Sequence, residues 1–208
     1  VQTLGFNDKK YSHLIAFRLN DHFKSDVQVN FYKKDQTFDS VFISCKSMTQ
    51  ESYKGYGHIC KSTVNSYCKK WNFDHNMQYC LKAFAGEFAV GGSKVIYFDN
   101  SFMTQYRELI LKNFREKITE VFDDLFLGKQ FGKIPNFFTV KVGDILFVCE
   151  MKDVLEYARG SGDVYFGQRT INQNLIIGNV KMTANRKSRN IQFKMYYKEM
   201  LRNLKHKA

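Results

Sequence analysis

The chain has 208 residues, of which 44% are hydrophobic and 16% aromatic, and it carries 32 lysines and arginines against 20 acidic residues, a net charge of +12. This apolar content excludes a globally disordered chain. The longest apolar runs have the length of a strand, far short of the roughly 18–20 residues of a membrane-spanning helix. We therefore expect no membrane partner.

The sequence shows no clear domain boundary. Pro135 is the only proline, and no linker rich in proline, glycine or serine divides the sequence. We expect a single domain over residues 1–208, with a β-rich N-terminal lobe at residues 1–57 and a basic hairpin at residues 172–198 as candidate subdivisions. No secretory signal peptide follows Val1, and the five cysteines include no C-x-x-C pair, which favours an intracellular, reducing compartment.

The N-terminal quarter alternates apolar and polar residues with the period of β-strands. Residues 26–32 and 38–45 show this alternation most clearly, and the polar segment between them predicts a hairpin turn. Residues 13–19 add a third strand. Further along, apolar residues at helical spacing predict two short helices that are broken near residues 72–74.

The second half predicts both helices and strands. The clearest helix covers residues 101–126, where Ser101 can cap the start and an apolar stripe runs along one side. A short strand before it, two later strands and a C-terminal hairpin are expected at residues 94–98, 137–142, 145–150, 174–182 and 190–197, with short helices at residues 153–158 and from residue 197 onward. The fold class is therefore α+β, with mostly antiparallel strands, one long amphipathic helix and a basic C-terminal β-hairpin.

Positive charge is concentrated at the C-terminal end. Residues 181–208 contain nine basic side chains and a single acid, Glu199. Such a concentration attracts phosphate backbones, because binding releases their counterions. The sequence thus favours a nucleic acid, either DNA or RNA, as the partner. An acidic protein surface, or a solvated tail with no specific partner, are the alternatives.

The predicted C-terminal hairpin would arrange these basic residues along a two-stranded ribbon and its turn. A two-stranded ribbon can lie along a duplex groove with its turn against phosphates, and tyrosines between lysines can stack on single-stranded bases. A surface hairpin with solubilising lysines explains the same pattern. The candidate nucleic-acid-binding residues are Lys181, Arg186, Lys187, Arg189, Lys194, Tyr196 and Lys198.

The segment from Pro135 to Lys152 resembles the PD-(D/E)xK nuclease superfamily. That family places an acid after a proline at the head of one strand, then a second acid and a lysine at the end of the next. Here Pro135-Asn136 stands at the first position and Glu150-Met151-Lys152 at the second. The chain departs from the pattern at Asn136, which has no carboxylate.

The resemblance implies a Mg²⁺-dependent nuclease. In the family the two acids hold Mg²⁺ and the lysine orients or activates the attacking water, because the transition state gathers negative charge and water is a poor nucleophile. It implies Glu150 and Lys152 as catalytic residues, with Glu150 as a metal ligand. Asp144 could replace the missing acid at the metal, and Glu116 lies on the preceding helix, from which such families often add a glutamate. An ordinary hairpin ending in Glu and Lys is the alternative interpretation.

A cysteine and histidine cluster is a possible zinc site. Zinc takes four such ligands in a tetrahedron, and the spacing here is C-x7-C-x6-H-x4-C. Buried thiols on helix faces explain two of the cysteines equally well, so zinc is a secondary candidate. The residues are Cys60, Cys68, His75 and Cys80.

Three functions are therefore open. The first is a non-catalytic nucleic-acid-binding protein that contacts phosphates through its C-terminal hairpin. The second is a metal-dependent nuclease of the PD-(D/E)xK type. The third is a structural or assembly protein of a phage or virus, for which a homo-oligomer or larger assembly is expected. The third rests on composition alone: many Lys, Asn, Phe and Tyr residues and one proline.

Overall fold

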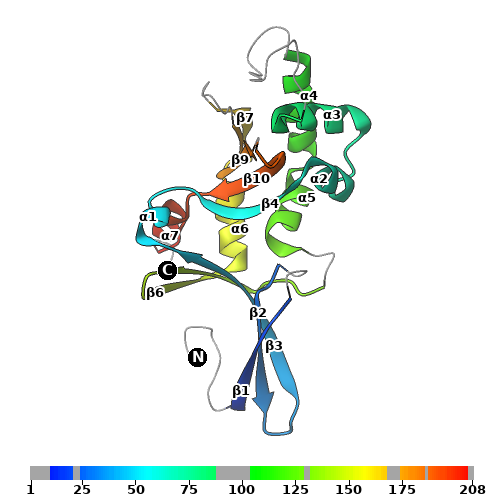
Figure 1. Ribbon diagram of the computed structural model, residues 1–208. Helices are drawn as coiled ribbons and strands as arrows, with labels where there is room; N and C mark the ends of the chain where they lie inside the picture. Colours follow the sequence, from blue (N-terminus) through cyan, green and yellow to red (C-terminus); the bar gives the residue numbers. More distant parts are fainter. Residues whose placement is uncertain are drawn as a thin grey trace.

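The computed structural model describes residues 10–20, 24–87, 104–128, 132–167, 174–185 and 187–205. The fold is α+β, as the sequence predicts, and its strands form two five-stranded sheets that are mostly antiparallel. In Figure 1 one sheet and most of the helices form the upper part, while the N-terminal strands extend downward as a ribbon. Among the described residues, no helix is both long and apolar enough to cross a membrane.

The first sheet contains, in spatial order, β1 (Tyr11–Arg18), β2 (Val27–Lys33), β3 (Phe38–Met48), β5 (Phe137–Val142) and β6 (Ile145–Glu150). All five strands are predicted by the sequence and are confirmed. Neighbours pair antiparallel except β3 and β5, which run parallel. In that parallel pair Ser44 lies beside Phe138, and Lys46 lies beside Val140.

The second sheet contains, in spatial order, β4 (Gly57–Thr63), β10 (Asn190–Met195), β9 (Val180–Asn185), β8 (Leu175–Ile177) and β7 (Val164–Phe166), and all neighbours pair antiparallel. The hairpin of β9 and β10 confirms the predicted C-terminal hairpin, but the strand predicted at residues 174–182 is divided at Gly178 into β8 and β9. The sequence does not predict β4. A β-bulge against β10 turns both Ile59 and Cys60 toward the core, and this interrupts the alternation on which strand prediction relies.

The helices are α1 (Gln50–Tyr53), α2 (Val64–Lys70), α3 (His75–Ala85), α4 (Thr104–Glu116), α5 (Ile118–Phe122), the π-helical turn η3 (Asp123–Leu127), α6 (Met151–Arg159) and α7 (Tyr197–Lys205). Helices α2 and α3 confirm the predicted pair. The single long helix predicted at residues 101–126 is wrong, because the chain leaves helical geometry at Lys117 (φ −108°, ψ 17°) and divides into α4, α5 and η3. The strand predicted at residues 94–98 lies outside the described residues.

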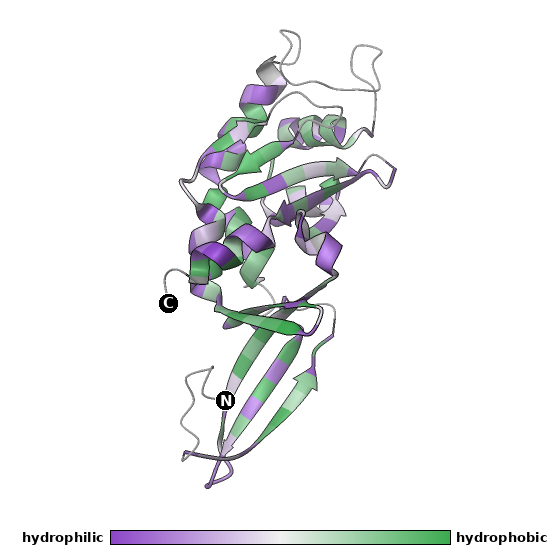
Figure 2. Cartoon of the chain, turned by 90° about the vertical axis from the view of Figure 1, so that its left-hand side faces the viewer, coloured by the Kyte–Doolittle hydropathy of each residue, from purple (hydrophilic) through white to green (hydrophobic). Residues whose placement is uncertain are grey.

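The main core lies between the second sheet and its helices. Helices α2, α3 and α4 and the turn η3 pack against this sheet, whereas α6 packs against β5 and β6. Trp71 is fully buried and stacks on Tyr67, with Phe114 and Phe193 edge-on to its ring. Figure 2 shows the hydrophobic residues of this layer and those that follow the ribbon strands. The ribbon has only a small core of its own, around Phe31.

Candidate active site

Asp26 lies immediately before β2, where β2 begins to pair with β3. Its backbone N–H donates to the carbonyl oxygen of Ile43 (2.8 Å). Its side-chain Oδ2 accepts a hydrogen bond from the backbone N–H of Cys45 (2.6 Å) and lies 3.4 Å from the Ser44 hydroxyl. The carboxylate is thereby fixed against β3 while the residue stays exposed. Such a carboxylate is suited to binding a cation or a reacting group.

Ser44 and Lys46 share one face of β3, because residues two apart on a strand point to the same side. Ser44 is buried and Lys46 is half-buried. Their neighbours on β5 are Phe138 and Val140, which belong to the main core. The strand pairing thus places Ser44 and Lys46 beside apolar residues of the core, while the Asp26 carboxylate lies at the exposed end of the pair. Asp26, Ser44 and Lys46 are hereafter the hairpin site.

Hydrogen bonds to the segment ahead of β5 fix the hairpin site. Ser25 is fully buried, and its hydroxyl donates to the carbonyl oxygen of Lys133 (2.7 Å). Asn136 pairs with Phe42 twice: its backbone N–H donates to the Phe42 carbonyl (2.7 Å), and its Oδ1 accepts from the Phe42 N–H (2.9 Å). The residue before Asp26 and the strand that carries Lys46 are therefore both tied to the same segment.

A polar network continues from the hairpin site along β2 and β3. Asn30 is buried, and its Oδ1 accepts hydrogen bonds from Gln28 Nε2 and from Ser40 Oγ, both at 2.8 Å. Gln28 Oε1 in turn lies 3.5 Å from the ammonium nitrogen of Lys133. Because buried amides are costly unless they are paired, this network holds the hairpin in one register beside Asp26.

The hairpin site has the arrangement of the PD-(D/E)xK pattern. Asp26 stands at the head of one strand, and Lys46 stands two residues after Ser44 on the next. Ser25 replaces the proline, and Ser44 replaces the second acid. Sequence reasoning missed this site because it started from the only proline in the chain. The signal that could have found it was an acid ahead of the first strand of the predicted hairpin, with a lysine closing the second.

The site predicted between Pro135 and Lys152 is organised differently. The two strands form as predicted, and Phe137 pairs with Glu150. Asn136, however, uses its side chain to bind Phe42. Glu150 Oε2 forms an ion pair with Lys152 Nζ at 2.7 Å on the surface, and this contact raises the pKa of Lys152. Both side chains are more than half exposed, in a setting where ion pairs contribute little.

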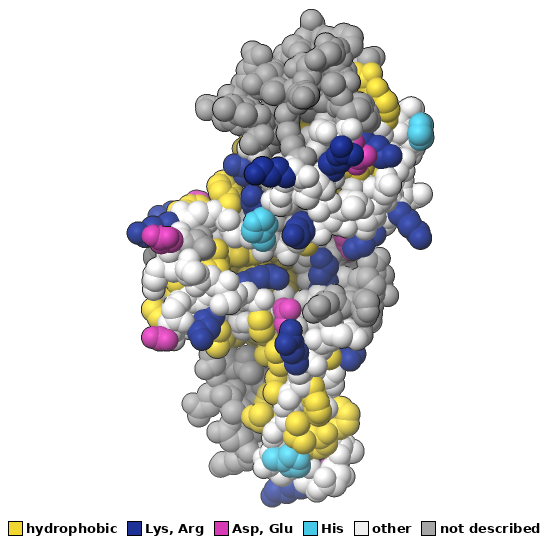
Figure 3. Space-filling view, viewed as in Figure 1, with side chains coloured by type: hydrophobic (Ala, Val, Ile, Leu, Met, Phe, Trp, Pro, Cys, Tyr) yellow, Lys and Arg dark blue, Asp and Glu magenta, His cyan; other side chains and the backbone are white. Residues whose placement is uncertain are grey.

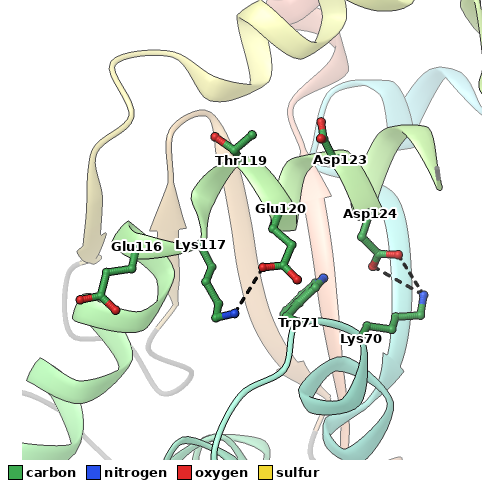
Figure 4. A pocket seen from close by; sticks show the side chains of 8 residues that line it. All are labelled: Lys70, Trp71, Glu116, Lys117, Thr119, Glu120, Asp123 and Asp124. Atoms are coloured by element: carbon green, nitrogen blue, oxygen red, sulfur yellow. Dashed lines mark hydrogen bonds and ion pairs between the residues drawn. The ribbon is translucent and has the colours of Figure 1, made fainter. Parts of the chain in front are cut away.

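The other two predicted catalytic residues lie elsewhere. Asp144 sits in the turn at the far end of β6, about 20 Å from Glu150 by the rise of a strand, so these two carboxylates cannot share an ion. Glu116 ends α4 and lines a cavity of about 520 Å³ near Trp71. Figure 4 shows this cavity, in which Lys70 pairs with Asp124 and Lys117 pairs with Glu120. Asp144, which was named as a replacement for the missing acid, is therefore too far from Glu150 to share an ion with it, and Glu116 lies at the cavity beside Trp71.

The predicted zinc ligands are not brought together. Within the described residues, which include Cys60, Cys68, His75 and Cys80, no group of three or more His, Cys, Asp or Glu side chains is placed to hold a metal ion. Burial raises the pKa of Cys68 and of Cys80 to about 11, so both thiols stay protonated. Cys60 Sγ lies 3.2 Å from the hydroxyl of Tyr67. The zinc interpretation is corrected to buried or partly buried thiols.

The predicted nucleic-acid-binding residues are spread along the chain from β9 to α7. Lys187 and Arg189 are exposed in the turn between β9 and β10, whereas Arg186 lies outside the described residues. Lys181 and Lys194 point away from the core on β9 and β10. Tyr196 packs beside Tyr56, and Lys198 is exposed on α7. Figure 3 shows Lys and Arg side chains across the middle of one face, over β4 and toward the first sheet.

Comparisons with known proteins identify a family and a similar fold. The family model described as "R.HinP1I restriction endonuclease" matches residues 4–201 of the chain. Among solved structures, the fold is similar to that of "restriction endonuclease MspI in complex with its cognate DNA", with a TM-score of 0.54 and 12% sequence identity. That match covers 93% of this chain and 74% of the other. No curated protein sequence matches the chain.

Proposed function

Because the chain belongs to the R.HinP1I restriction endonuclease family, we propose that it is a Mg²⁺-dependent endonuclease that cuts duplex DNA at the hairpin site. The observation that supports this assignment is the placement of Asp26, Ser44 and Lys46 at the ends of one antiparallel strand pair. The family match favours a nuclease over both a non-catalytic binder and an assembly protein. The predicted homo-oligomer stays a prediction.

The donor atoms of the hairpin site fit Mg²⁺. This ion prefers oxygen ligands, keeps several waters, and is usually held by one or two carboxylates together with substrate phosphates. Asp26 offers an exposed carboxylate, and the Ser44 hydroxyl lies beside it. Since Ser44 stands where the superfamily has an acid, this chain would hold the ion with one carboxylate fewer, and a DNA phosphate and water would complete the ligand set.

Each residue of the hairpin site has a distinct role in the proposal. Mg²⁺, when bound, supplies charge neutralisation at the phosphate and a more acidic water. Asp26 holds the ion in a position fixed by the Cys45 N–H. Lys46 places a positive charge where the phosphodiester becomes more negative. Its apolar neighbour Val140 excludes water on one side and so strengthens the electrostatic effect of that charge.

The superfamily resemblance also implies a competing catalytic site, the surface pair of Glu150 and Lys152, which only variants at the two sites can distinguish from the hairpin site.

The proposed activity itself is tested with the unaltered protein. Purified protein should convert duplex DNA to discrete fragments with Mg²⁺, and should leave it intact with excess chelator. Fragment ends mapped on a sequenced plasmid would show whether cutting occurs at a defined sequence. Uncut DNA under all metal conditions, by protein shown to be folded, would contradict the proposed function.

The proposed contact with DNA includes the turn of the C-terminal hairpin of β9 and β10. Lys187 and Arg189 are exposed in its turn, and cations there can meet phosphates. This contact is part of the proposal and is separable from catalysis. Neutralising both residues should weaken DNA binding and lower its dependence on salt without changing which bonds are cut.

A further inference from the structure

Three basic side chains lie side by side across three neighbouring strands of the second sheet. Lys194 on β10 pairs with His58 on β4 and, on its other side, with Lys181 on β9. These residues form the outer face, because Phe193 and Met195 on the same strand point into the core. His58, Lys194 and Lys181 are hereafter the cationic row.

The adjacent row of residues on the same face adds a fourth basic side chain and a hydroxyl group without a hydrogen-bond partner among the described residues. Lys61 on β4 pairs with Gln192, which pairs with Thr183 on β9. The Thr183 hydroxyl is buried and has no hydrogen-bond partner among the described residues. Neither row contains a carboxylate. Glu199 of α7 lies near the Lys181 end, where the two residues line one small cavity.

The cationic row is electrostatically unfavourable unless an anion binds to it. Like charges directly opposite each other on neighbouring strands repel, because their Cβ atoms are only about 5 Å apart. Burial and the charges of Lys194 and Lys61 together lower the pKa of His58, which is the response of a group that avoids adding to this repulsion. The Lys181 ammonium is also held in place, 4.8 Å from the ring centroid of Tyr56.

The spacing of the row suits a phosphodiester backbone. Three neighbouring strands span about 10 Å from the first to the third. One strand of DNA carries a phosphate about every 3.4 Å along the helix axis, so roughly three or four consecutive phosphates cover that length. A single inorganic anion could contact only part of the row.

A buried tyrosine connects the cationic row to the hairpin site. Tyr197 donates a hydrogen bond from its hydroxyl to the His58 carbonyl (2.8 Å), and its ring lies 5.7 Å from that of Phe138. Phe138 is the neighbour of Ser44 in the first sheet. These contacts hold β4, which carries His58, in a fixed relation to the part of the first sheet that carries Ser44.

We propose that the cationic row binds the phosphate backbone of duplex DNA beside the cut site, with Lys61 extending the contact. The inference rests on the proposed function, because it takes the same DNA as its ligand. It assigns to the second sheet a positioning role for the substrate, and chemistry stays with the hairpin site.

The test compares two double variants with equal loss of charge. In one, Lys181 and Lys194 are changed to Gln. In the control, the exposed lysines Lys34 and Lys112 are changed to Gln. Binding to a labelled 30-base-pair duplex is measured by fluorescence anisotropy without Mg²⁺ over a salt series. Thermal melting confirms that both proteins are folded.

The row variant should bind at least tenfold more weakly at low salt. The slope of log affinity against log salt should be smaller by roughly 1–2, since each phosphate contact contributes about 0.9. The control should keep the wild-type slope. Equal slopes and affinities in the two variants would overturn the cationic row, and cutting by wild-type protein with Mg²⁺ would still support the nuclease. The opposite result, a row effect without cutting, would retain the row and overturn the nuclease.

Discussion

The carboxylate of Asp26 accepts a 2.6 Å hydrogen bond from the backbone N–H of Cys45, across the junction between β2 and β3. This bond fixes an exposed acid relative to a strand whose next residue is Lys46. Ser25, which precedes Asp26 where the superfamily has a proline, is anchored by a hydrogen bond from its hydroxyl to the Lys133 carbonyl. The predictions below follow from this arrangement.

Lys46→Ala should lower the cutting rate by on the order of 10²–10³, the usual loss when one preorganised donor is removed from an active site. Binding to uncleaved DNA without metal should change far less, because only one of many phosphate contacts is lost. Single-turnover cleavage and anisotropy measure the two effects separately. The matched control is Lys152→Ala, which should cut at the wild-type rate. A reversed ranking of the two variants would move the catalytic lysine to β6.

Ser44→Asp should create a second carboxylate beside Asp26. Without metal, two carboxylates a few ångströms apart repel, and the new one is also buried, so the melting temperature should fall. Millimolar Mg²⁺ should raise it again, and by more than it raises that of the wild type, because a ligand that binds only the folded state stabilises it. Scanning calorimetry with and without Mg²⁺ checks this prediction. The absence of any Mg²⁺ effect on the variant would argue against a metal at this position.

DNA affinity should increase as the pH falls through the range of about 5–7. In the free protein, burial and the charges of Lys194 and Lys61 lower the pKa of His58, so the imidazole is neutral at neutral pH. A phosphate against the cationic row favours the charged form and raises that pKa. The complex then holds more protons than the free protein, so binding strengthens at lower pH. His58→Asn should remove this part of the pH dependence, and an unchanged profile in that variant would exclude His58 from the interface.

Gly57→Ala should destabilise the protein by about 1–3 kcal/mol through overpacking. A Cβ atom at this position would overlap the ring of Tyr197 and lie 2.5 Å from its Cδ2 atom. Tyr197 is buried between His58 and Phe138, so its ring has little room to move. Gly167→Ala is the control, because its nearest neighbour would be 3.6 Å away. Urea unfolding of both variants measures the difference, and equal stabilities would contradict the packing described for Tyr197.

Local patterns in the sequence predicted most of the elements. Strict alternation identified β2 and β3, and the turn at Gly143 and Asp144 identified β5 and β6. The elements α1, β4 and β7 were not predicted, and the helix predicted at residues 101–126 was not expected to break. The bulge in β4 depends on pairing with β10, and the break at Lys117 interrupts an apolar stripe that is otherwise continuous.

The site was harder to predict than the fold. The sequence alone does not show that β3 runs parallel to β5, and this contact turns Asn136 into a structural partner of Phe42. The apparent match at Pro135 thus marks a strand that supports the hairpin site. The family match supports the resemblance to a nuclease superfamily, and the catalytic residues that we propose lie on the neighbouring strand pair.

The most direct test compares Asp26→Asn with Glu150→Gln, each an exchange of a carboxylate for an amide of nearly the same shape. Both proteins are incubated with plasmid DNA and Mg²⁺, and both are first shown to bind a DNA duplex without metal. The account predicts that Asp26→Asn binds DNA but does not cut it, whereas Glu150→Gln cuts as the wild type does. Cutting by Asp26→Asn together with loss of cutting in Glu150→Gln would contradict the hairpin site as the catalytic centre.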